Sequence, residues 1–393
     1  MPRAAIRVKA LMLIVCYAAV SSAAADMTFW LDFTDFDASP YGFGGQEAAL
    51  IDDIYSAVAA DYSPWPFTIG YDFDPVTPGY QAPTGSYSHV DIGGYDGNAG
   101  AYIFGIAEDI DWRNLNHEDS VIIFSSEFDS WNSTYFDNWD RLTNTLAGTT
   151  AHEMGHILGL SHHTAFGPLG EAGVPGYTQV PYEGGSETNQ HIMATGSTGL
   201  SIAERASDRA FGERETWALD AAAGRITVRS EVGGYHQSRE TAQLLDGGYS
   251  ISVTASISTV GEKDWYAFSW QQGDEICLEV FSQRGNRFTD PINPYFELYD
   301  PTGSLVGSWD DYWAYSTGGD SVLLDFEVPQ TGDWSLFVSD GIPTGPGDIA
   351  YGLGEGLGDY ELWMHDKPVP EPATCAMVLL GLGGVALRMR RKV

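Results

Sequence analysis

The sequence predicts an α+β domain followed by an all-β sandwich domain. The chain has 393 residues, more than one ordinary domain requires, so two hydrophobic cores are expected. Residues 26–230 mix strand-like and helix-like patterns, whereas residues 240–365 carry roughly eight short β-like runs separated by Gly, Asp and Pro. This change of pattern marks the predicted boundary between the two domains.

The first 25 residues have the composition of a secretory signal peptide. Three basic residues precede the apolar run "LMLIVCYAAV", and Ala23 and Ala25 stand at the small-residue positions of a cleavage site. We expect signal peptidase to remove residues 1–25 during export. A transmembrane anchor is the alternative, but the apolar run is too short to span the roughly 30 Å hydrocarbon core of a bilayer.

The part of the chain between its two ends is strongly acidic. The whole chain has a formal net charge of −35, and residues 26–365 contain 11 basic and 52 acidic side chains, a net charge of −41. Such a surface repels nucleic acid and anionic lipid headgroups, so neither is an expected partner. It also offers oxygen ligands for Ca²⁺, although a solvated surface adapted to saline surroundings has the same composition.

Residue spacing predicts the elements of the first domain in order. The segment "MTFWLDF" (27–33) alternates apolar and polar side chains as a half-buried strand does, and residues 45–62 carry an apolar stripe at helical spacing. The segment "SVIIFSS" (120–126) has the composition of a buried strand. A second helix is expected from Asp137, a suitable N-cap, because apolar residues at helical spacing follow it.

The segment "HEMGHILGLSHH" (152–163) begins in the last turns of that helix and contains four of the nine histidines. His152 and His156 are four residues apart, so on a helix they share a face and can bind one metal ion. A catalytic zinc site uses three protein ligands and leaves one position for water, so a third ligand is needed. Gly159 can adopt the left-handed conformation that ends the helix, and this turn directs His162 back toward the first two histidines.

The polar residues around these three histidines have different expected roles. Glu153 follows the first ligand and can reach a water on the ion, so it is the expected general base. His163 competes with His162 as the third ligand, but its spacing from Gly159 is less suitable. His191 is expected to pack beside the site, because a fourth protein ligand would close the open position.

The pattern HExxHxxGxxH resembles the zinc signature of the metzincin clan of metalloproteases, and "HEMGHILGLSHH" is most similar to the matrixin branch. The resemblance implies a twisted, mostly parallel sheet with an active-site helix, a catalytic Zn²⁺, and a methionine turn below the metal. "NQHIMATG" has Met193 where that turn is expected. Thr195 stands where some branches have a tyrosine close to zinc, so a mechanism that needs this tyrosine is excluded.

Two upstream segments are also similar to matrixin features. "AGAYIFGIA" (99–107) is the candidate edge strand along which an extended peptide substrate would lie, held by main-chain pairing. "HVDIGGYDG" resembles the loop that helps to hold structural zinc and calcium in matrixins, with His89, Asp91 and Asp96 matching. Phe104 stands where a later histidine of that loop is expected, so a calcium site or a tight Gly-Asp loop is favoured over structural zinc.

Residues 240–365 resemble a bacterial pre-peptidase C-terminal domain, a β-sandwich often appended to secreted proteases. The resemblance is carried by "GEKDWYAFSWQQGD", "YFELYDPTGSLVGSWDD", "VPQTGDWSLFVSD" and "GDYELWM". It implies a fold but no particular function. Asp264, Asp310 and Asp311 could join in a Ca²⁺ site, or each could stabilise a turn.

Residues 366–393 resemble a PEP-CTERM sorting tail. The segment "VPEPAT" precedes an uncharged run (373–387) and a basic end. A helix of that length is about 22 Å long and spans a membrane only marginally, with the basic end on the cytoplasmic side. The resemblance implies transient membrane anchoring, recognition by an exosortase, and delivery to the cell surface or extracellular matrix. A permanent transmembrane helix is the alternative.

Together these observations predict an exported zinc metalloendopeptidase that hydrolyses peptide bonds in extracellular or cell-surface proteins. Its expected partners are protein or peptide substrates, signal peptidase and an exosortase-type enzyme. The alternative is a non-catalytic, calcium-dependent matrix or adhesion protein built on a metzincin-like domain. Glu153 favours the enzyme, because a domain that only bound metal would not need a base beside it.

Overall fold

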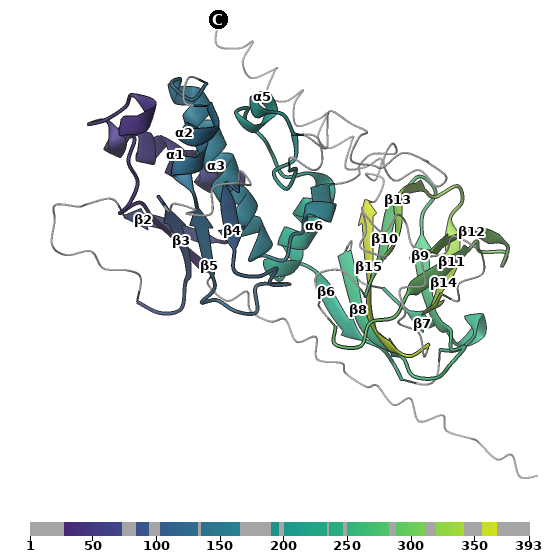
Figure 1. Ribbon diagram of the computed structural model, residues 1–393. Helices are drawn as coiled ribbons and strands as arrows, with labels where there is room; N and C mark the ends of the chain where they lie inside the picture. Colours follow the sequence, from purple (N-terminus) through teal and green to yellow (C-terminus); the bar gives the residue numbers. More distant parts are fainter. Residues whose placement is uncertain are drawn as a thin grey trace, which may run out of the picture.

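The computed structural model of the chain describes residues 27–72, 84–93, 103–132, 135–165, 190–195, 200–233, 236–246, 250–282, 288–310, 320–341 and 356–367. The predicted signal peptide and the tail beyond residue 367 lie outside the described residues. The described part is a mixed α/β structure, with one sheet and its helices followed by two further sheets (Figure 1). No helix in these ranges is both long and apolar enough to cross a membrane.

A five-stranded sheet forms the base of the first region, in the order β2-β1-β3-β5-β4. The parallel strands are β1 (Thr28–Asp32), β2 (Thr68–Asp72), β3 (Ser88–Ile92) and β5 (Ser120–Ile123), and β4 (Gly105–Ala107) runs antiparallel to β5 at the edge. Phe29 and Leu31 of β1 are buried, in the alternation expected for that segment. The predicted strand at 120–126 is too long, because Ser125 already begins a helix.

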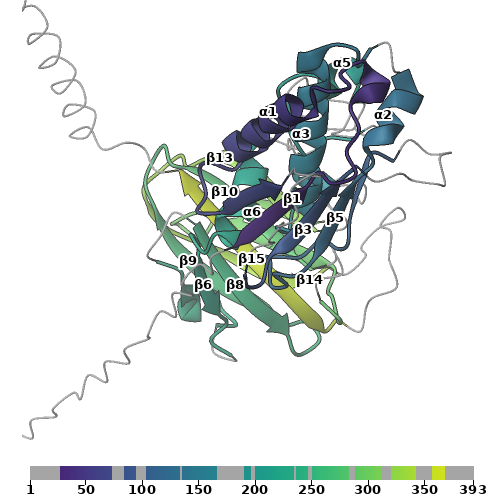
Figure 2. The same cartoon turned by 90° about the vertical axis from the view of Figure 1, so that its left-hand side faces the viewer.

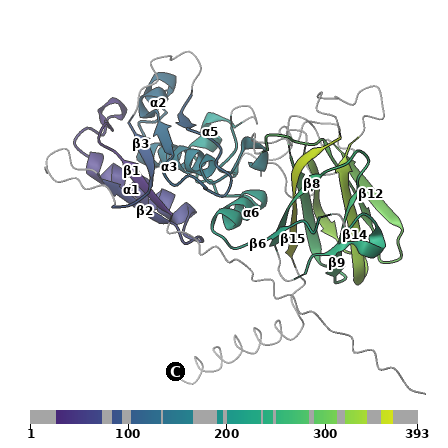
Figure 3. The same ribbon diagram turned by 90° about the horizontal axis from the view of Figure 1, so that it is seen from below.

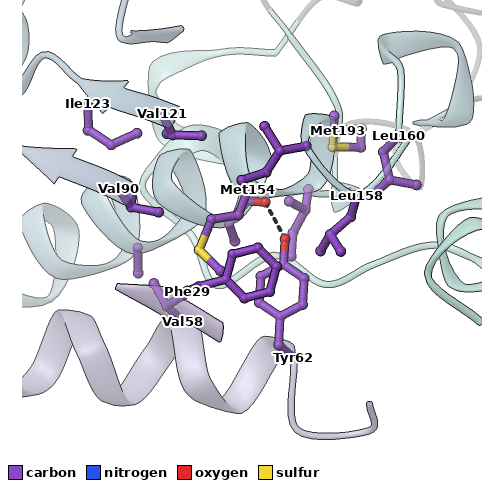
Figure 4. Close-up of a cluster of buried hydrophobic side chains, with 14 of the residues drawn as sticks. Phe29, Val58, Tyr62, Val90, Val121, Ile123, Met154, Leu158, Leu160 and Met193 are labelled. Carbon is purple, nitrogen blue, oxygen red and sulfur yellow. Dashed lines mark hydrogen bonds between the residues drawn. The ribbon is translucent and has the colours of Figure 1, made fainter. Parts of the chain in front are cut away.

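Helices cover one face of this sheet (Figure 2). The two long helices, α1 (Glu47–Asp61) and α3 (Trp139–His156), pack against each other. The shorter helices are α2 (Ser125–Asn132), α5 (Ile202–Arg205) and α6 (Glu213–Ala222), with 3-10 turns η1 (Ser39–Tyr41), η2 (His162–Ala165) and η5 (Arg239–Thr241). Apolar side chains from strands and helices meet in one core, which includes Phe29, Val58, Val90 and Met154 (Figure 4).

Helix α3 begins one residue later than expected. Its N-cap is Asn138 rather than Asp137, because Asn138 has the extended backbone of an N-cap and its side chain accepts a hydrogen bond from the Arg141 N–H at 3.0 Å. Near the other end of α3, the Tyr62 hydroxyl donates to the Ala151 carbonyl at 2.7 Å (Figure 4). This bond ties the end of α1 to α3 directly before His152.

Two five-stranded sheets form the second region and face each other across a shared hydrophobic core (Figure 3). Their orders are β13-β10-β15-β8-β6 and β12-β11-β14-β9-β7. The strands are β6 (Thr227–Ser230), β7 (Gln243–Leu244), β8 (Ser250–Ile257), β9 (Asp264–Trp270), β10 (Glu275–Phe281), β11 (Pro294–Tyr299), β12 (Leu305–Asp310), β13 (Ser321–Glu327), β14 (Gly332–Asp340) and β15 (Gly358–Lys367).

The first strand of this sandwich lies before the predicted boundary. Strand β6 belongs to residues 26–230 in the sequence-based division, but it pairs in parallel with β8. Four residues are too few for a period of two to be distinguished from a connecting segment. The chain therefore enters the sandwich at residue 227.

Candidate metal centre

The end of helix α3 places His152 and His156 among its buried residues. Gly159 has a φ of +91°, the left-handed conformation that stops a helix. The Leu160 N–H donates to the Gly155 carbonyl and the Gly159 N–H to the His156 carbonyl, both at 2.9 Å, which is the bond pair of a Schellman cap. The chain then turns back, and η2 begins at the third histidine of the motif.

Three imidazoles converge at this turn. The candidate ligand nitrogens of His152, His156 and His162 lie within 4.8 Å of one another. Nε2 of His152 is 3.1 Å from Nε2 of His162. Two nitrogens bound tetrahedrally to one Zn²⁺ at about 2.0–2.1 Å would be about 3.3 Å apart. The spacing of the three rings therefore fits a single tetrahedral ion.

Backbone carbonyls fix the orientation of two of the rings. Nδ1 of His152 lies 2.8 Å from the Ile192 carbonyl oxygen, and Nδ1 of His156 lies 2.8 Å from the Leu160 carbonyl oxygen. Because a carbonyl only accepts, each Nδ1 carries the proton and each Nε2 presents a lone pair.

The surroundings also keep the three rings neutral. Burial lowers the pKa of His152 well below its usual range and that of His156 to about 4, and in both cases neighbouring imidazoles add to the effect. Burial lowers the pKa of His162 as well. Three neutral imidazoles at neutral pH are the donor set of many catalytic zinc sites.

The Glu153 carboxylate lies against the edge strand β4. A Cβ atom on Gly105 would lie 2.6 Å from Cγ and 2.8 Å from Oε1 of Glu153, so the glycine leaves the space that this side chain fills. Burial raises the pKa of Glu153 to about 7, although a hydrogen bond from the Ala107 N–H and the charge of Arg205 both lower it. The carboxylate can therefore gain or lose a proton close to neutral pH.

Met193 is fully buried against the end of α3. A Cβ atom on Gly155, between His152 and His156, would lie 2.8 Å from the Met193 sulfur. Figure 4 shows the Met193 side chain beside Leu160, on the helix-end side of the core. The methionine thus forms an apolar support directly behind the segment that carries the histidines.

Two buried ionisable residues, Arg209 and Glu215, hold the turn at 191–194. Nη1 of Arg209 donates to three carbonyls of this turn, at 3.1, 3.0 and 3.5 Å, and Glu215 accepts from the Met193 N–H at 2.8 Å. Burial raises the pKa of Glu215 to about 8. The sequence analysis missed both residues. No spacing pattern points to their contacts with the turn, because the backbone groups of the turn are 15 to 22 residues away; Glu215 also accepts locally from the Gly212 N–H at the start of α6.

The other two histidines of the motif region lie outside the ligand set. His191 directs Nδ1 to the Ala165 carbonyl at 3.0 Å and does not belong to the three-histidine group. The side chain of His163 lies outside the described part of the structure. Among described residues, the imidazoles that converge are the three expected from the spacing around Gly159, and their binding of a metal ion stays a prediction.

The upstream loop does not assemble a metal site among the described residues. His89 lies on β3 with Nε2 3.2 Å from Oδ2 of Asp32, and Asp91 is paired with Asp32 across the parallel strands. Burial and the Asp32 charge raise the pKa of Asp91. Asp96, the third residue of the predicted set, lies outside the described residues.

The structure also separates two of the three predicted calcium ligands of the sandwich. Asp264 begins β9 and Asp310 ends β12, and β14 and β11 lie between them in the sheet. Three strand spacings of about 4.8 Å place them about 14 Å apart, so the two do not share a cation. Asp311 lies outside the described residues.

Asp264 belongs to a different group of potential ligands. Its carboxylate, that of Glu231 and the imidazole of His236 bring ligand atoms within 4.8 Å of one another. Nε2 of His236 lies 3.1 Å from Oε1 of Glu231, and the Tyr360 hydroxyl donates to Oδ2 of Asp264 at 2.8 Å. Within the described ranges this is the second group that could hold a metal ion.

Comparison with known families identifies the tail. The family model of the PEP-CTERM protein-sorting motif matches residues 368–392, which confirms the predicted sorting signal. This motif is a recognition signal for exosortases, and it indicates export and C-terminal membrane anchoring. No curated protein matches the chain.

Several solved structures are similar to parts of the chain. Archaemetzincin from Methanopyrus kandleri is 11% identical with a TM-score of 0.29, and the match covers 52% of this chain and 98% of that one. The pre-peptidase C-terminal domain of a collagenase from Bacillus anthracis is 16% identical with a TM-score of 0.23, covering 31% and 93%. PliG, a periplasmic lysozyme inhibitor from Aeromonas hydrophila, is 11% identical with a TM-score of 0.22, covering 36% and 99%. None of these likenesses decides the activity of this chain.

Proposed function

We propose that this chain is an exported zinc-dependent metalloendopeptidase, with a metzincin-like catalytic domain, a pre-peptidase C-terminal-like sandwich and a sorting tail. The observation that carries the proposal is the convergence of three neutral imidazoles beside a buried carboxylate with a pKa of about 7. His152, His156 and His162 would hold the ion. A zinc ion bound there would polarise a peptide carbonyl and lower the pKa of water toward about 7.

The edge strand β4 is the proposed binding site for the substrate backbone. The residues that flank β4 both bond toward β5. The Phe104 carbonyl accepts from the Phe124 N–H, and the Glu108 N–H donates to the Ser120 carbonyl, each at 2.9 Å. Main-chain groups alternate in direction along an antiparallel strand, so those of Gly105 and Ala107 face away from β5. The Ala107 N–H is used by Glu153, and the remaining groups can pair with an extended peptide.

Main-chain pairing of this kind reads few side chains, so the substrate class is extended polypeptide. Such pairing would place a substrate carbonyl close to Glu153, because this carboxylate contacts the same strand. Because the sorting motif indicates export, the proposed substrates are proteins at the cell surface or in the extracellular matrix.

Glu153 carries the proton transfers in the proposed mechanism. Its carboxylate removes a proton from the attacking water, whose oxygen forms the new bond to the carbonyl carbon. The C–N bond then breaks, and Glu153 delivers the proton to the leaving amine. Burial raises the pKa of Glu153, which makes the carboxylate a stronger base for the first step.

The test compares the wild-type chain with Glu153→Ala on a broad peptide library. We expect the variant to retain its zinc, measured by elemental analysis, and to lose cleavage by at least about 10²-fold. Asp140→Asn is the matched control, because Asp140 is an exposed acid at the other end of the same helix.

Equal cleavage by wild type and Glu153→Ala would refute the assigned role of the base. Zinc-loaded wild type that cleaves no peptide of the library would instead favour the non-catalytic matrix or adhesion protein.

A further inference from the structure

The outer face of one sandwich sheet is covered by the first region instead of by water. In β10, six consecutive residues from Ile276 to Phe281 are buried, so both faces of this strand are covered. One face contributes Leu278 and Val280 to the sandwich core, whereas Cys277 and Phe281 belong to the core of the first region. A sandwich sheet with a free outer face would bury only alternate residues. Figure 1 shows β10 and β15 on the side of the sandwich that faces α6.

The first contact of this face reaches the loop after β4. The Trp112 ring lies 4.7 Å from the Trp363 ring and 5.5 Å from the Phe281 ring, measured between centroids. The Arg113 guanidinium bonds to Glu361 at 2.5 Å and to Ser252 at 2.7 Å, and the Glu361 side chain is fully buried.

This loop lies directly against the end of α3. The Asp111 N–H donates to the His156 carbonyl at 3.1 Å. A Cβ atom on Gly159 would lie 3.0 Å from Cα of Trp112 and 3.2 Å from the nitrogen of Arg113. The segment that touches the sandwich thus also touches the turn that follows a candidate ligand.

The backbone of the loop needs external support. Arg113 and Asn114 have φ values of +63° and +49°, and they are the non-glycine residues with positive φ in the described part of the chain. A non-glycine residue in this left-handed region persists only where its surroundings hold it. The ion pair with Glu361 and the packing on Trp363 supply that support.

The second contact of the same face reaches α6. Arg214 and Glu279 form an ion pair at 2.5 Å with side chains only 3% and 4% exposed, and Trp217 stacks on His365 with centroids 4.4 Å apart. Glu215, next to Arg214, accepts the Met193 N–H and so holds the turn behind the histidines.

We infer that the β8–β15–β10 face of the sandwich is an integral part of the candidate metal centre. Trp112, Arg113 and Arg214 are positioning residues, through which the sandwich fixes the two segments that hold the histidines. Through Trp112 and Arg113, the sandwich supports His156 and Gly159. Through Arg214 and the adjacent Glu215, it supports Met193 and the Ile192 carbonyl that orients His152. The inference rests on the proposed metal site but not on peptide hydrolysis.

The test measures metal binding in the full chain. Glu361→Gln removes the charge that Arg113 requires, and Trp112→Leu removes the ring contact without leaving a buried charge unpaired. We expect each variant to bind zinc about tenfold more weakly, measured by chelator competition, since residues that orient metal ligands have effects of this size. The visible absorption of the Co²⁺-substituted protein should change as well, which a general loss of stability would not cause in the folded fraction. Asp246→Asn, which alters an exposed ion pair with Arg229 on the same sandwich, is the matched control.

Unchanged zinc affinity and an unchanged Co²⁺ spectrum in folded Trp112→Leu would overturn the inference, even if Glu361→Gln failed to fold. A tenfold loss in Trp112→Leu, with Asp246→Asn equal to wild type, would support it. Zinc affinity and the Co²⁺ spectrum can be measured whether or not the wild-type protein cleaves peptides. A failure of the proposed protease activity can therefore be distinguished from a failure of this inference.

Discussion

Gly105→Ala should abolish the proposed peptide hydrolysis without preventing zinc from binding. The new Cβ atom would lie 2.6 Å from Cγ of Glu153, whereas carbon atoms in ordinary contact are about 3.5–4.0 Å apart. The carboxylate must therefore move by about 1 Å, and a displacement of that size in a catalytic group costs on the order of 10²-fold in rate. The free energy of unfolding should change little, because crowding of about 1–3 kcal/mol opposes the gain of about 0.5–1 kcal/mol from replacing a strand glycine.

The assay is kcat/KM on a peptide that the wild type cleaves, with zinc content and urea unfolding measured on the same samples. Gly233→Ala is the control, since a Cβ atom there meets nothing within 4 Å among the described residues. A Gly105→Ala variant with full zinc and wild-type kcat/KM would refute the placement of Glu153 against β4 as the working position of the base.

Three further results are expected. Because burial raises the pKa of Glu153 and the base acts only when ionised, kcat/KM should fall on the acid side as this carboxylate becomes protonated; a profile that shows no acid limb would contradict this assignment. Arg209→Met should lower the free energy of unfolding, measured in urea, by about 3 kcal/mol, because the turn carbonyls and Glu215 lose a buried charged partner. The control Arg141→Met, at an exposed position, should cost less than about 1 kcal/mol. Equal losses in the two variants would contradict the role of Arg209 in holding the turn at 191–194. Intact mass of the protein exported from its native cells should show processing near residues 370–372, and a mature C-terminus that retains "RMRRKV" would show that the tail is a permanent anchor.

The candidate ligands follow from the sequence because their arrangement is local. His152 and His156 share a helical face through their spacing of four, and Gly159 turns the chain only three residues before His162. All three lie within eleven residues, so helix geometry and one left-handed glycine are enough to bring them together. The alternation in β1 and the helical stripe of α1 are predictable for the same reason.

Interactions between distant segments could not be predicted in this way. The sequence places Asp264 and Asp310 in the same domain, but sheet order is not chain order, and two strands separate them. The space for Glu153 depends on a glycine 48 residues earlier in the chain, and no periodicity relates the two positions. Periodicity states which face of an element is apolar and leaves open which other element covers it.

The sequence by itself determined the sorting motif at residues 368–392 and the order of a mixed α/β region before a mostly-sheet region, and its spacing singled out the residues proposed to bind zinc, because each depends on composition or on spacing within one element. Only the tertiary structure decided that Arg209 and Glu215 hold the turn at 191–194. It also decided that a buried sandwich face supports the loop at Trp112 and Arg113. These contacts join residues up to 248 positions apart, and their partners are chosen by the packing of whole elements, which no local pattern encodes.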